Sequence, residues 1–209
     1  MSDLINFFIN GKAVKANADD SIWEVSKREG NFIPHLCHSD KSGYKADGNC
    51  RSCVVEIKGE RTLAASCIRK PFNGMEVITN NDKVEKSQKL VLELLLSDQP
   101  VKEKSHNKNS YFWKILETKK ISKTRFPKKD TKTIPELDKS HPAMTVALDS
   151  CIQCGLCIRA CRDVQVNDVL GMAGRGTNSY PVFDFDDLMG TSSCVGCGEC
   201  VQACPTGAL

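Results

Sequence analysis

Eight cysteines in two runs of identical spacing constrain the last third of this chain more than any other feature does. The runs read CIQCGLCIRAC and CVGCGECVQACP, and each has the spacing C-x2-C-x2-C-x3-C. Their cysteines are, in order, Cys151, Cys154, Cys157, Cys161, Cys194, Cys197, Cys200 and Cys204. Three thiolates two residues apart can curl only around one corner of a cubane cluster. We expect the fourth cysteine of each run at the start of a helix, pointing away from the other three.

Two-cluster ferredoxins have the same spacing, and in them the fourth cysteine ligates the other cluster. We therefore predict two [4Fe-4S] clusters, with the ligand sets Cys151, Cys154, Cys157, Cys204 and Cys161, Cys194, Cys197, Cys200. The ferredoxin rule also expects a proline after the fourth cysteine, which Pro205 satisfies and Arg162 does not. Structural zinc is the alternative, but zinc sites usually combine two C-x2-C pairs across a longer loop rather than a tight triple.

The remaining four cysteines lie in the N-terminal part, at Cys37, Cys50, Cys53 and Cys67. Their spacing, C-x12-C-x2-C-x13-C, shares the central pair and the distant fourth cysteine of the plant-type [2Fe-2S] pattern, while its first interval is longer. Zinc is again the alternative, although only one C-x2-C pair is present. We predict a [2Fe-2S] cluster here. All twelve cysteines are then ligands, so none is left as a nucleophile.

The expected compartment is the cytoplasm, where reductants keep thiols free to bind metal. The 209-residue chain opens without a basic region, apolar run and small-residue cleavage site, and no segment is apolar for long enough to cross a bilayer. Its length suits one or two compact domains. We therefore expect no membrane span and no disulfide framework.

Turn and strand patterns predict an α+β unit over residues 1–79. INFFIN and AVKA, joined at Gly11-Lys12, read as one hairpin, and VVEIKG with ERTLAA reads as another around Gly59. MEVIT is expected to add a further strand. Between the hairpins, Ser21 and Glu24 have the spacing of a helix capping box, and Gly30 is a helix stop.

A long helix and a basic connector are expected over residues 80–143. The helix runs through KVEKSQKLVLELLLSDQP, capped at Asn81 or Asp82. Residues 101–133 carry eleven Lys or Arg and three Asp or Glu, a net charge of +8, whereas the other residues carry 18 and 23, a net charge of −5. The segment SYFWKILE places Tyr111, Phe112, Ile115 and Leu116 at core-like helical spacing, so we expect packing rather than nucleic-acid binding. Residues 144–209 are the expected two-cluster domain, which TVALD enters as a short strand.

Two stretches also resemble known iron–sulfur proteins. The first stretch is IPHLCHSDKSGYKADGNCRSCVVEIKGERTLAASCIRKPFNGMEVIT. It is similar to the [2Fe-2S] domain shared by the large iron–sulfur subunit of NADH-quinone oxidoreductase, iron-only hydrogenases and NAD-linked formate dehydrogenases. The two-cluster segment of the formate dehydrogenase α subunit resembles HPAMTVALDSCIQCGLCIRACRDVQVNDVLGMAGRGTNSYPVFDFDDLMGTSSCVGCGECVQACPTGAL. The resemblance implies an α+β chain made of a β-grasp [2Fe-2S] ferredoxin-like domain, a helical and basic connector, and a bacterial-ferredoxin-like domain.

Departures from the family limit what the resemblance implies. Where the family has SDHP, whose His joins three cysteines around another [4Fe-4S] cluster, this chain has SDQP with Gln99, and no cysteine lies between Cys67 and Cys151. We expect that cluster to be absent. His35 and His38 flank Cys37 and are either hydrogen-bonding neighbours of the cluster or solvent-exposed. In the family, ACPTGAL leads into a molybdenum- or tungsten-pterin domain, and we expect this chain to lack that domain. The chain is then expected to be either a separate electron-transfer subunit or a fragment of a longer polypeptide.

The function predicted from sequence is electron transfer, with no catalytic site in the chain itself. The expected cofactors are one [2Fe-2S] and two [4Fe-4S] clusters. The resemblance implies a formate dehydrogenase complex, with electrons relayed between a pterin-containing catalytic domain and a flavin or NAD subunit. A freestanding ferredoxin-like carrier and a zinc-stapled interaction module are the alternatives.

Overall fold

The computed structural model describes residues 4–128 and 135–209. The chain forms two compact units. Unit 1 extends to Asp40 and resumes over Ala46–Leu92, and unit 2 comprises Lys41–Lys45 and Glu93–Leu209. The division into segments 1–79, 80–143 and 144–209 stays a prediction from sequence.

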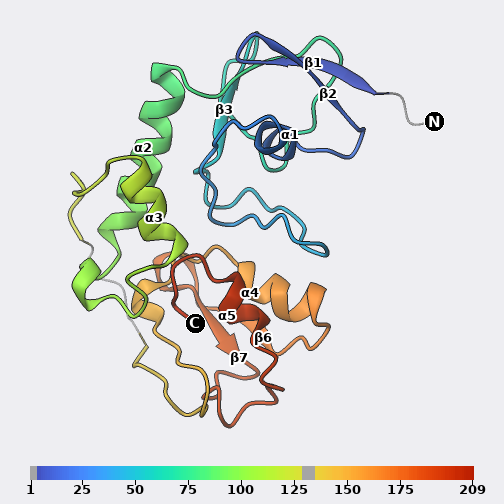
Figure 1. The fold of residues 1–209 in the computed structure, drawn as a ribbon. Coiled ribbons are helices and arrows are strands. Elements are labelled where there is room, and N and C mark those ends of the chain that lie inside the picture. The colour runs from blue at the N-terminus through green and yellow to red at the C-terminus, as the bar shows by residue number, and fades with distance from the viewer. Residues whose placement is uncertain (1–3, 129–134) are drawn as a thin grey trace. The chain divides into compact units, whose positions relative to one another are not determined.

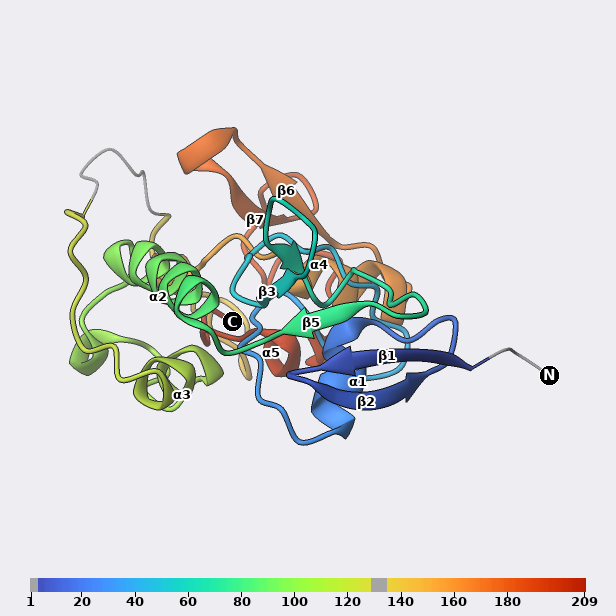
Figure 2. The same ribbon diagram turned by 90° about the horizontal axis from the view of Figure 1, so that it is seen from above.

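Unit 1 is built on a five-stranded sheet of order β2-β1-β5-β3-β4 (Figures 1 and 2). Its strands are β1 (Ile5–Ile9), β2 (Lys12–Ala16), β3 (Val54–Ile57), β4 (Ala64–Ala65) and β5 (Glu76–Ile78). Both predicted hairpins are confirmed as antiparallel pairs, and β5 joins them because it runs parallel to β1 and antiparallel to β3. Alternate residues of β1, including Phe7 and Ile9, point into the core.

Helix α1 (Ile22–Arg28) begins and ends as its sequence predicts. The Ser21 hydroxyl accepts a hydrogen bond from Glu24 N, and the Glu24 carboxylate accepts one from Ser21 N, so the capping box is present. Past the helix end, Gly30 has φ of 78°, its N–H donates to Lys27 O, and Asn31 N donates to Ser26 O. The left-handed glycine and this hydrogen-bond pair define a Schellman motif.

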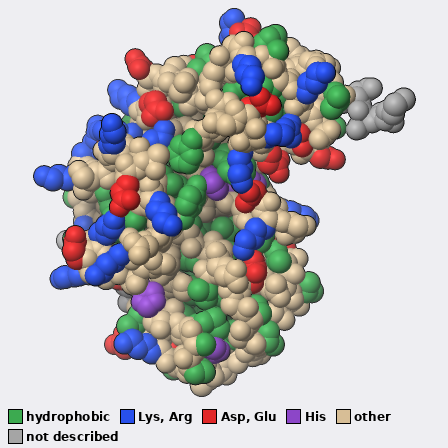
Figure 3. Space-filling view, in the orientation of Figure 1, with side chains coloured by type: hydrophobic (Ala, Val, Ile, Leu, Met, Phe, Trp, Pro, Cys, Tyr) green, Lys and Arg blue, Asp and Glu red, His purple; other side chains and the backbone are tan. Residues whose placement is uncertain are grey.

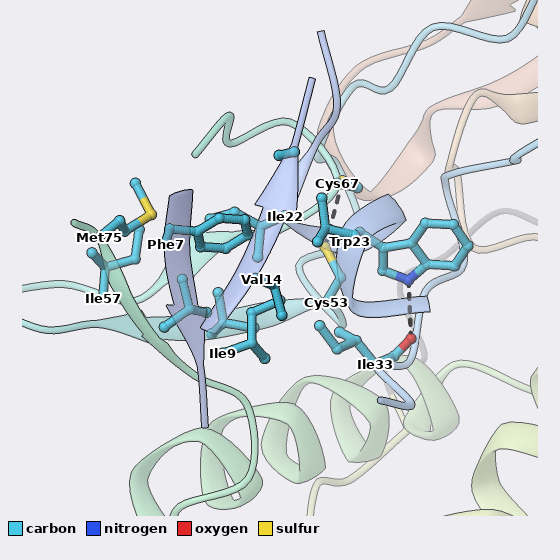
Figure 4. Close-up of a cluster of buried hydrophobic side chains, with 14 of the residues drawn as sticks. Phe7, Ile9, Val14, Ile22, Trp23, Ile33, Cys53, Ile57, Cys67 and Met75 are labelled. Atoms are coloured by element: carbon cyan, nitrogen blue, oxygen red, sulfur yellow. Dashed lines mark hydrogen bonds between the residues drawn. The ribbon is translucent and has the colours of Figure 1, made fainter. Parts of the chain in front are cut away.

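The core of unit 1 lies between α1 and the sheet (Figure 4). Phe7, Ile22 and Trp23 are buried in it, and Trp23 Nε1 donates to Ile33 O at 3.1 Å. Cys53 and Cys67 belong to the same buried cluster. Two of the predicted ligands are therefore fixed by the packing of the core itself.

Helix α2 (Asp82–Ser97) confirms the predicted long helix, with Asn81 as its cap. Asn81 Oδ1 accepts from Val84 N at 3.0 Å. Gln88 is buried and donates from Nε2 to Val54 O at 2.9 Å, which connects the helix to the first residue of β3. The first turns of α2 thus belong to unit 1, and the division between the units falls after Leu92.

Unit 2 contains η1 (Lys102–Lys104), α3 (Tyr111–Thr118), η2 (Leu148–Ser150), α4 (Leu156–Arg159), η3 (Ala160–Val164), β6 (Leu170–Ala173), η4 (Gly176–Asn178), β7 (Tyr180–Phe183) and α5 (Glu199–Ala203). Helix α3 buries Phe112, Trp113, Ile115 and Leu116. The predicted packing face is confirmed with one change, because Trp113 is buried in it while Tyr111 is only partly buried.

Two further features of unit 2 differ from the sequence expectation. TVALD is not a strand: Val146 forms a single bridge with Asp138, and the chain then turns into η2. Strands β6 and β7 form an antiparallel hairpin that the sequence patterns did not predict. None of the helices in the described part of the chain has the length and apolar character needed to cross a membrane.

Candidate iron–sulfur sites

One cavity in unit 2 has four thiols in its wall, from Cys151, Cys154, Cys157 and Cys204. Cys157 lies in α4 and is buried, and Cys204 follows the last residue of α5. Burial raises the pKa of Cys157 well above its usual value, and the neighbouring sulfurs of Cys154, Cys151 and Cys204 raise it further. Four close thiols cannot all ionise without a positive charge among them, which iron would supply.

The backbone around this cavity donates hydrogen bonds to sulfur. Gln153 N donates to Cys151 Sγ at 3.3 Å, and Ala208 N donates to Cys204 Sγ at 3.3 Å. Gln153 and Gly155 have φ of 56° and 70°, so the chain coils left-handed between successive cysteines. Such N–H donors stabilise thiolate ligands and tune cluster potentials.

A second cavity has the other four thiols of the two runs in its wall, from Cys161, Cys194, Cys197 and Cys200. Burial, together with Cys194, Cys197 and Cys161, raises the pKa of Cys200 to about 12. Gly196 N donates to Cys194 Sγ at 3.4 Å, which repeats the hydrogen bond of Gln153 in the first run.

The structure therefore places the fourth cysteine of each run beside the first three of the other run. One detail differs from expectation: Cys161 lies in the π-helical turn η3 after α4, and Cys204 caps the C-terminal end of α5. The helices begin near the third cysteine of each run, so the fourth is one turn further on and reaches the opposite cavity. Ligation by these eight sulfurs stays a prediction.

The four cysteines of unit 1 also lie together. Cys50 N donates to Cys37 Sγ at 3.4 Å, and the sulfurs of Cys53 and Cys67 are 3.4 Å apart (Figure 4). Hydrogen bonds from the thiols of Cys50 and Cys67 lower the pKa of Cys37, whereas donating to Cys37 and Cys53 raises the pKa of Cys67. The four thiols are therefore close enough to change one another's pKa.

Two histidines pack against Trp23 near this cluster. The ring centroid of His35 is 4.4 Å from that of Trp23, and the centroid of His38 is 4.6 Å from it. His38 is buried and His35 is partly buried, so neither is fully solvent-exposed. Burial, reinforced by His38, lowers the pKa of His35 to about 4. Hydrogen bonding of these rings to a cluster stays a prediction.

The donor chemistry at the three sites fits iron–sulfur clusters. All twelve cysteines are free thiols, and each site gathers four of them. Within residues 4–128 and 135–209, no group of His, Cys, Asp or Glu is arranged to hold a single metal ion. The fit therefore rests on the sulfur sets and the N–H groups directed at them.

Sequence reasoning missed several donors beside these sulfurs. The Ser52 hydroxyl lies 3.1 Å from Cys50 Sγ, and Asn167 Nδ2 is 3.9 Å from Cys197 Sγ. Ser52 could have been found, since it lies inside the CRSC pair. Asn167 is thirty residues from its sulfur, and no local pattern links the two.

Two family models match the chain. A 2Fe-2S iron–sulfur cluster binding domain matches residues 2–82, and a 4Fe-4S dicluster domain matches residues 150–208. The matched segments contain the four N-terminal cysteines and the two C-terminal runs respectively.

Two curated relatives match most of the chain. The chain is 28% identical over 183 residues to the NADH-ubiquinone oxidoreductase 78 kDa subunit, mitochondrial, of Candida albicans. This alignment covers 81% of this chain and 24% of the relative. It is 26% identical over 186 residues to an NADH-quinone oxidoreductase subunit of Rickettsia typhi, and this alignment covers 83% of this chain and 25% of the relative. The chain spans about a quarter of the length of these relatives.

A solved structure has a similar fold. A chain of the NAD+-reducing [NiFe]-hydrogenase in the H2-reduced state aligns with a TM-score of 0.84 at 22% identity, over 97% of this chain and 85% of that chain. These proteins are NADH oxidoreductase subunits and a hydrogenase chain, and they do not specifically support a formate dehydrogenase. The two matches thus give the chain a 2Fe-2S iron–sulfur cluster binding domain followed by a 4Fe-4S dicluster domain.

Proposed function

We propose that this chain is an electron-transfer module that holds one [2Fe-2S] and two [4Fe-4S] clusters and passes single electrons between larger redox partners. The observation that carries the proposal is the arrangement of eight thiols in unit 2 around two cavities, each with three sulfurs from one run and one from the other. That arrangement matches the crossed ligation of two-cluster ferredoxins.

The proposed ligands are those expected from the sequence. Cys37, Cys50, Cys53 and Cys67 would hold the [2Fe-2S] cluster in a domain whose sheet order and helix α1 are consistent with a β-grasp fold. The sets Cys151, Cys154, Cys157, Cys204 and Cys161, Cys194, Cys197, Cys200 would hold the [4Fe-4S] clusters.

The chain's own residues would contribute position, burial and hydrogen bonds. When bound, the clusters supply one-electron redox chemistry. The buried thiols of Cys53, Cys157 and Cys200 keep solvent from parts of the three sites, which limits how far water screens the charge of the reduced state. Backbone N–H groups at Gln153 and Gly196 stabilise thiolate charge without a change in shape.

The partner we propose is an NAD-linked flavoprotein on one side and a two-electron catalytic subunit on the other. The relatives of this chain include NADH-quinone oxidoreductase subunits, and a hydrogenase chain has a similar fold. The sequence resemblance to formate dehydrogenase makes a pterin-containing subunit one candidate for the second partner. A freestanding carrier is the competing function.

Iron analysis of anaerobically purified protein tests the proposal. We expect a brown protein whose visible absorption bleaches on reduction, with about ten iron atoms per chain from one two-iron and two four-iron clusters. Electron paramagnetic resonance should resolve a [2Fe-2S] signal and two [4Fe-4S] signals. A colourless protein with stoichiometric zinc would contradict the proposal.

Purification of the tagged chain from its native host distinguishes a subunit from a carrier. A subunit should co-purify with stoichiometric redox partners, and the preparation should reduce its clusters with NADH. A carrier should elute near its own mass of 23.1 kDa and need an added reductase.

A further inference from the structure

A cavity with no cysteine in its wall opens in unit 2, next to helix α3. Its volume is about 930 Å3, at the upper end of the range of roughly 300–1,000 Å3 for small-molecule sites. Three segments form it: the end of α2 with the turn that follows, α3, and residues 120–128. None of the three carries a predicted cluster ligand, so the cavity is a feature of its own.

The wall of the cavity is largely apolar. Trp113, Leu116 and Ile121 are buried residues that line it, and Leu96, Pro100 and Phe126 add partly buried surface. An aromatic ring in a wall of this kind favours a flat or aromatic ligand, because ring stacking adds to the burial of apolar area.

Charged residues also line the cavity, and most of them are exposed. Lys102, Lys120, Lys123 and Lys128 stand against two carboxylates, Glu103 and Glu117. Lys102 pairs with Glu117, whereas neither Lys120 nor Lys123 pairs with a carboxylate in the described ranges. Figure 3 shows Lys and Arg side chains gathered on the left of the molecule, over the α2 and α3 region. A cationic rim above an apolar wall suits an anion that has an apolar body.

A hydrogen bond fixes one polar residue in the wall of the cavity. Gln99 lines the cavity with only 6% of its surface exposed. Its Nε2 donates to Ser150 O at 3.2 Å, and since a carbonyl only accepts, the amide oxygen must face the other way. That oxygen, Oε1, is buried and accepts no hydrogen bond from the described residues. Because this atom has almost no accessible surface, a ligand in the open cavity cannot contact it, and Gln99 contributes a fixed side chain to the wall rather than an acceptor.

We propose that this cavity binds a small amphipathic organic anion. The apolar body would lie on Trp113 and Leu116, and the carboxylate or phosphate head would meet Lys120 and Lys123. Since no cysteine lines the cavity, the bound anion would not be a ligand of a cluster.

Isothermal titration calorimetry on the anaerobic holoprotein tests the proposal, because it is unaffected by the colour of the clusters. The probes are 2-naphthoate and 2-naphthamide, which share one aromatic body and differ in charge. We expect saturable binding of one 2-naphthoate per chain and at least tenfold weaker binding of the amide. Added salt should weaken only the binding of the anion. A comparison with 2-naphthyl phosphate shows which head group the site prefers.

Three variants locate the binding. The double substitution Lys120→Met with Lys123→Met should weaken 2-naphthoate binding at least tenfold, and Ser122→Trp should weaken both probes by filling the cavity. Lys114→Met is the matched control, since Lys114 lies on α3 but does not line the cavity. The proposal is overturned if the acid and the amide bind equally, if neither binds, or if the double variant and the control behave alike.

Discussion

The hydroxyl of Tyr44 donates a hydrogen bond to Oε1 of Glu199 at 2.8 Å. Glu199 lies between Cys197 and Cys200 at the start of α5, and Lys41 Nζ is 3.6 Å from the same carboxylate oxygen. Burial and the neighbouring carboxylate raise the pKa of Tyr44, which keeps the phenol protonated and able to donate. The short segment Lys41–Lys45 is thereby held in unit 2, against the helix that carries Cys200.

Removing the hydroxyl of Tyr44 should destabilise this part of unit 2. Tyr44→Phe removes one hydrogen-bond donor from the largely buried Glu199 carboxylate. We therefore expect the free energy of unfolding to fall by about 1 kcal/mol. Hydrogen exchange of amides in α5, followed by mass spectrometry, measures the change as faster exchange. Tyr180→Phe is the control, because Tyr180 donates to Asp186 at an exposed site and its loss should leave exchange unchanged. Equal exchange in Tyr44→Phe and the wild type would contradict this interpretation.

The capping box of α1 gives a prediction for unit 1. Ser21→Ala removes the acceptor for Glu24 N at the first turn of α1. We expect the free energy of unfolding of unit 1 to fall by about 1 kcal/mol. Ser21→Asp, which restores an acceptor at the same position, should recover most of that loss. Urea titration under anaerobic conditions, followed by far-ultraviolet circular dichroism, compares the two. If the alanine and aspartate variants unfold at the same urea concentration, the cap does not stabilise the helix.

Local chemistry explains why some of the structure could be predicted from sequence. The cap at Ser21, the stop at Gly30 and the cap at Asn81 depend on residues within four positions of one another, and each was confirmed. The short intervals within each run explain why its first three cysteines lie together, whereas the crossed position of the fourth was expected from the ferredoxin pattern.

Long-range packing explains what the sequence did not reveal. Lys41–Lys45 belongs to unit 2 because Tyr44 meets Glu199, which lies 155 residues away. The β6–β7 hairpin was missed because Gly171 and Pro181, both poor strand formers, lie within its strands. The cavity at Gln99 has walls from three separate segments, and no single one of them has the pattern of a binding site.

Crossed ligation in unit 2 predicts which cysteine variants should resemble each other. Cys204→Ala and Cys151→Ala should impair the same cluster and give the same electron paramagnetic resonance spectrum. Cys161→Ala should instead match Cys197→Ala, since those sulfurs line the second cavity. If Cys204→Ala matched Cys197→Ala, each run would hold its own cluster and the crossed arrangement would be wrong.

The hydroxyl of Ser52 should tune the potential of the [2Fe-2S] cluster. It is buried and lies 3.1 Å from Cys50 Sγ, where a hydrogen bond would favour the more negative, reduced state. We expect Ser52→Ala to lower the midpoint potential by some tens of millivolts, on the scale of one hydrogen bond of about 1 kcal/mol. Redox titration followed by electron paramagnetic resonance measures the shift. Ser26→Ala is the control, since Ser26 is equally buried and its hydroxyl has no hydrogen-bond partner in the described residues. The same shift in both variants would assign the effect to packing.

The ends of α1 and α3 share one motif with different residues at its left-handed position. In α3, Lys120 N donates to Glu117 O and Ile121 N donates to Leu116 O, which is the Schellman pattern seen at Gly30. Lys120 has φ of 53°, a conformation that costs a residue with a side chain about 1 kcal/mol more than it costs glycine. The lysine is therefore unfavourable for the helix and lies in the wall of the cavity.

Exchanging the two residues separates stability from binding. Lys120→Gly should stabilise unit 2 by about 1 kcal/mol, because glycine adopts positive φ freely, and it should weaken 2-naphthoate binding because a cation leaves the rim. Gly30→Lys should destabilise unit 1 by a similar amount through backbone strain alone, since nothing lies within 4 Å of the added Cβ. Urea titration and calorimetry on the same samples measure both quantities. A lysine kept for helix stability would give the opposite result, with Lys120→Gly less stable and 2-naphthoate affinity unchanged.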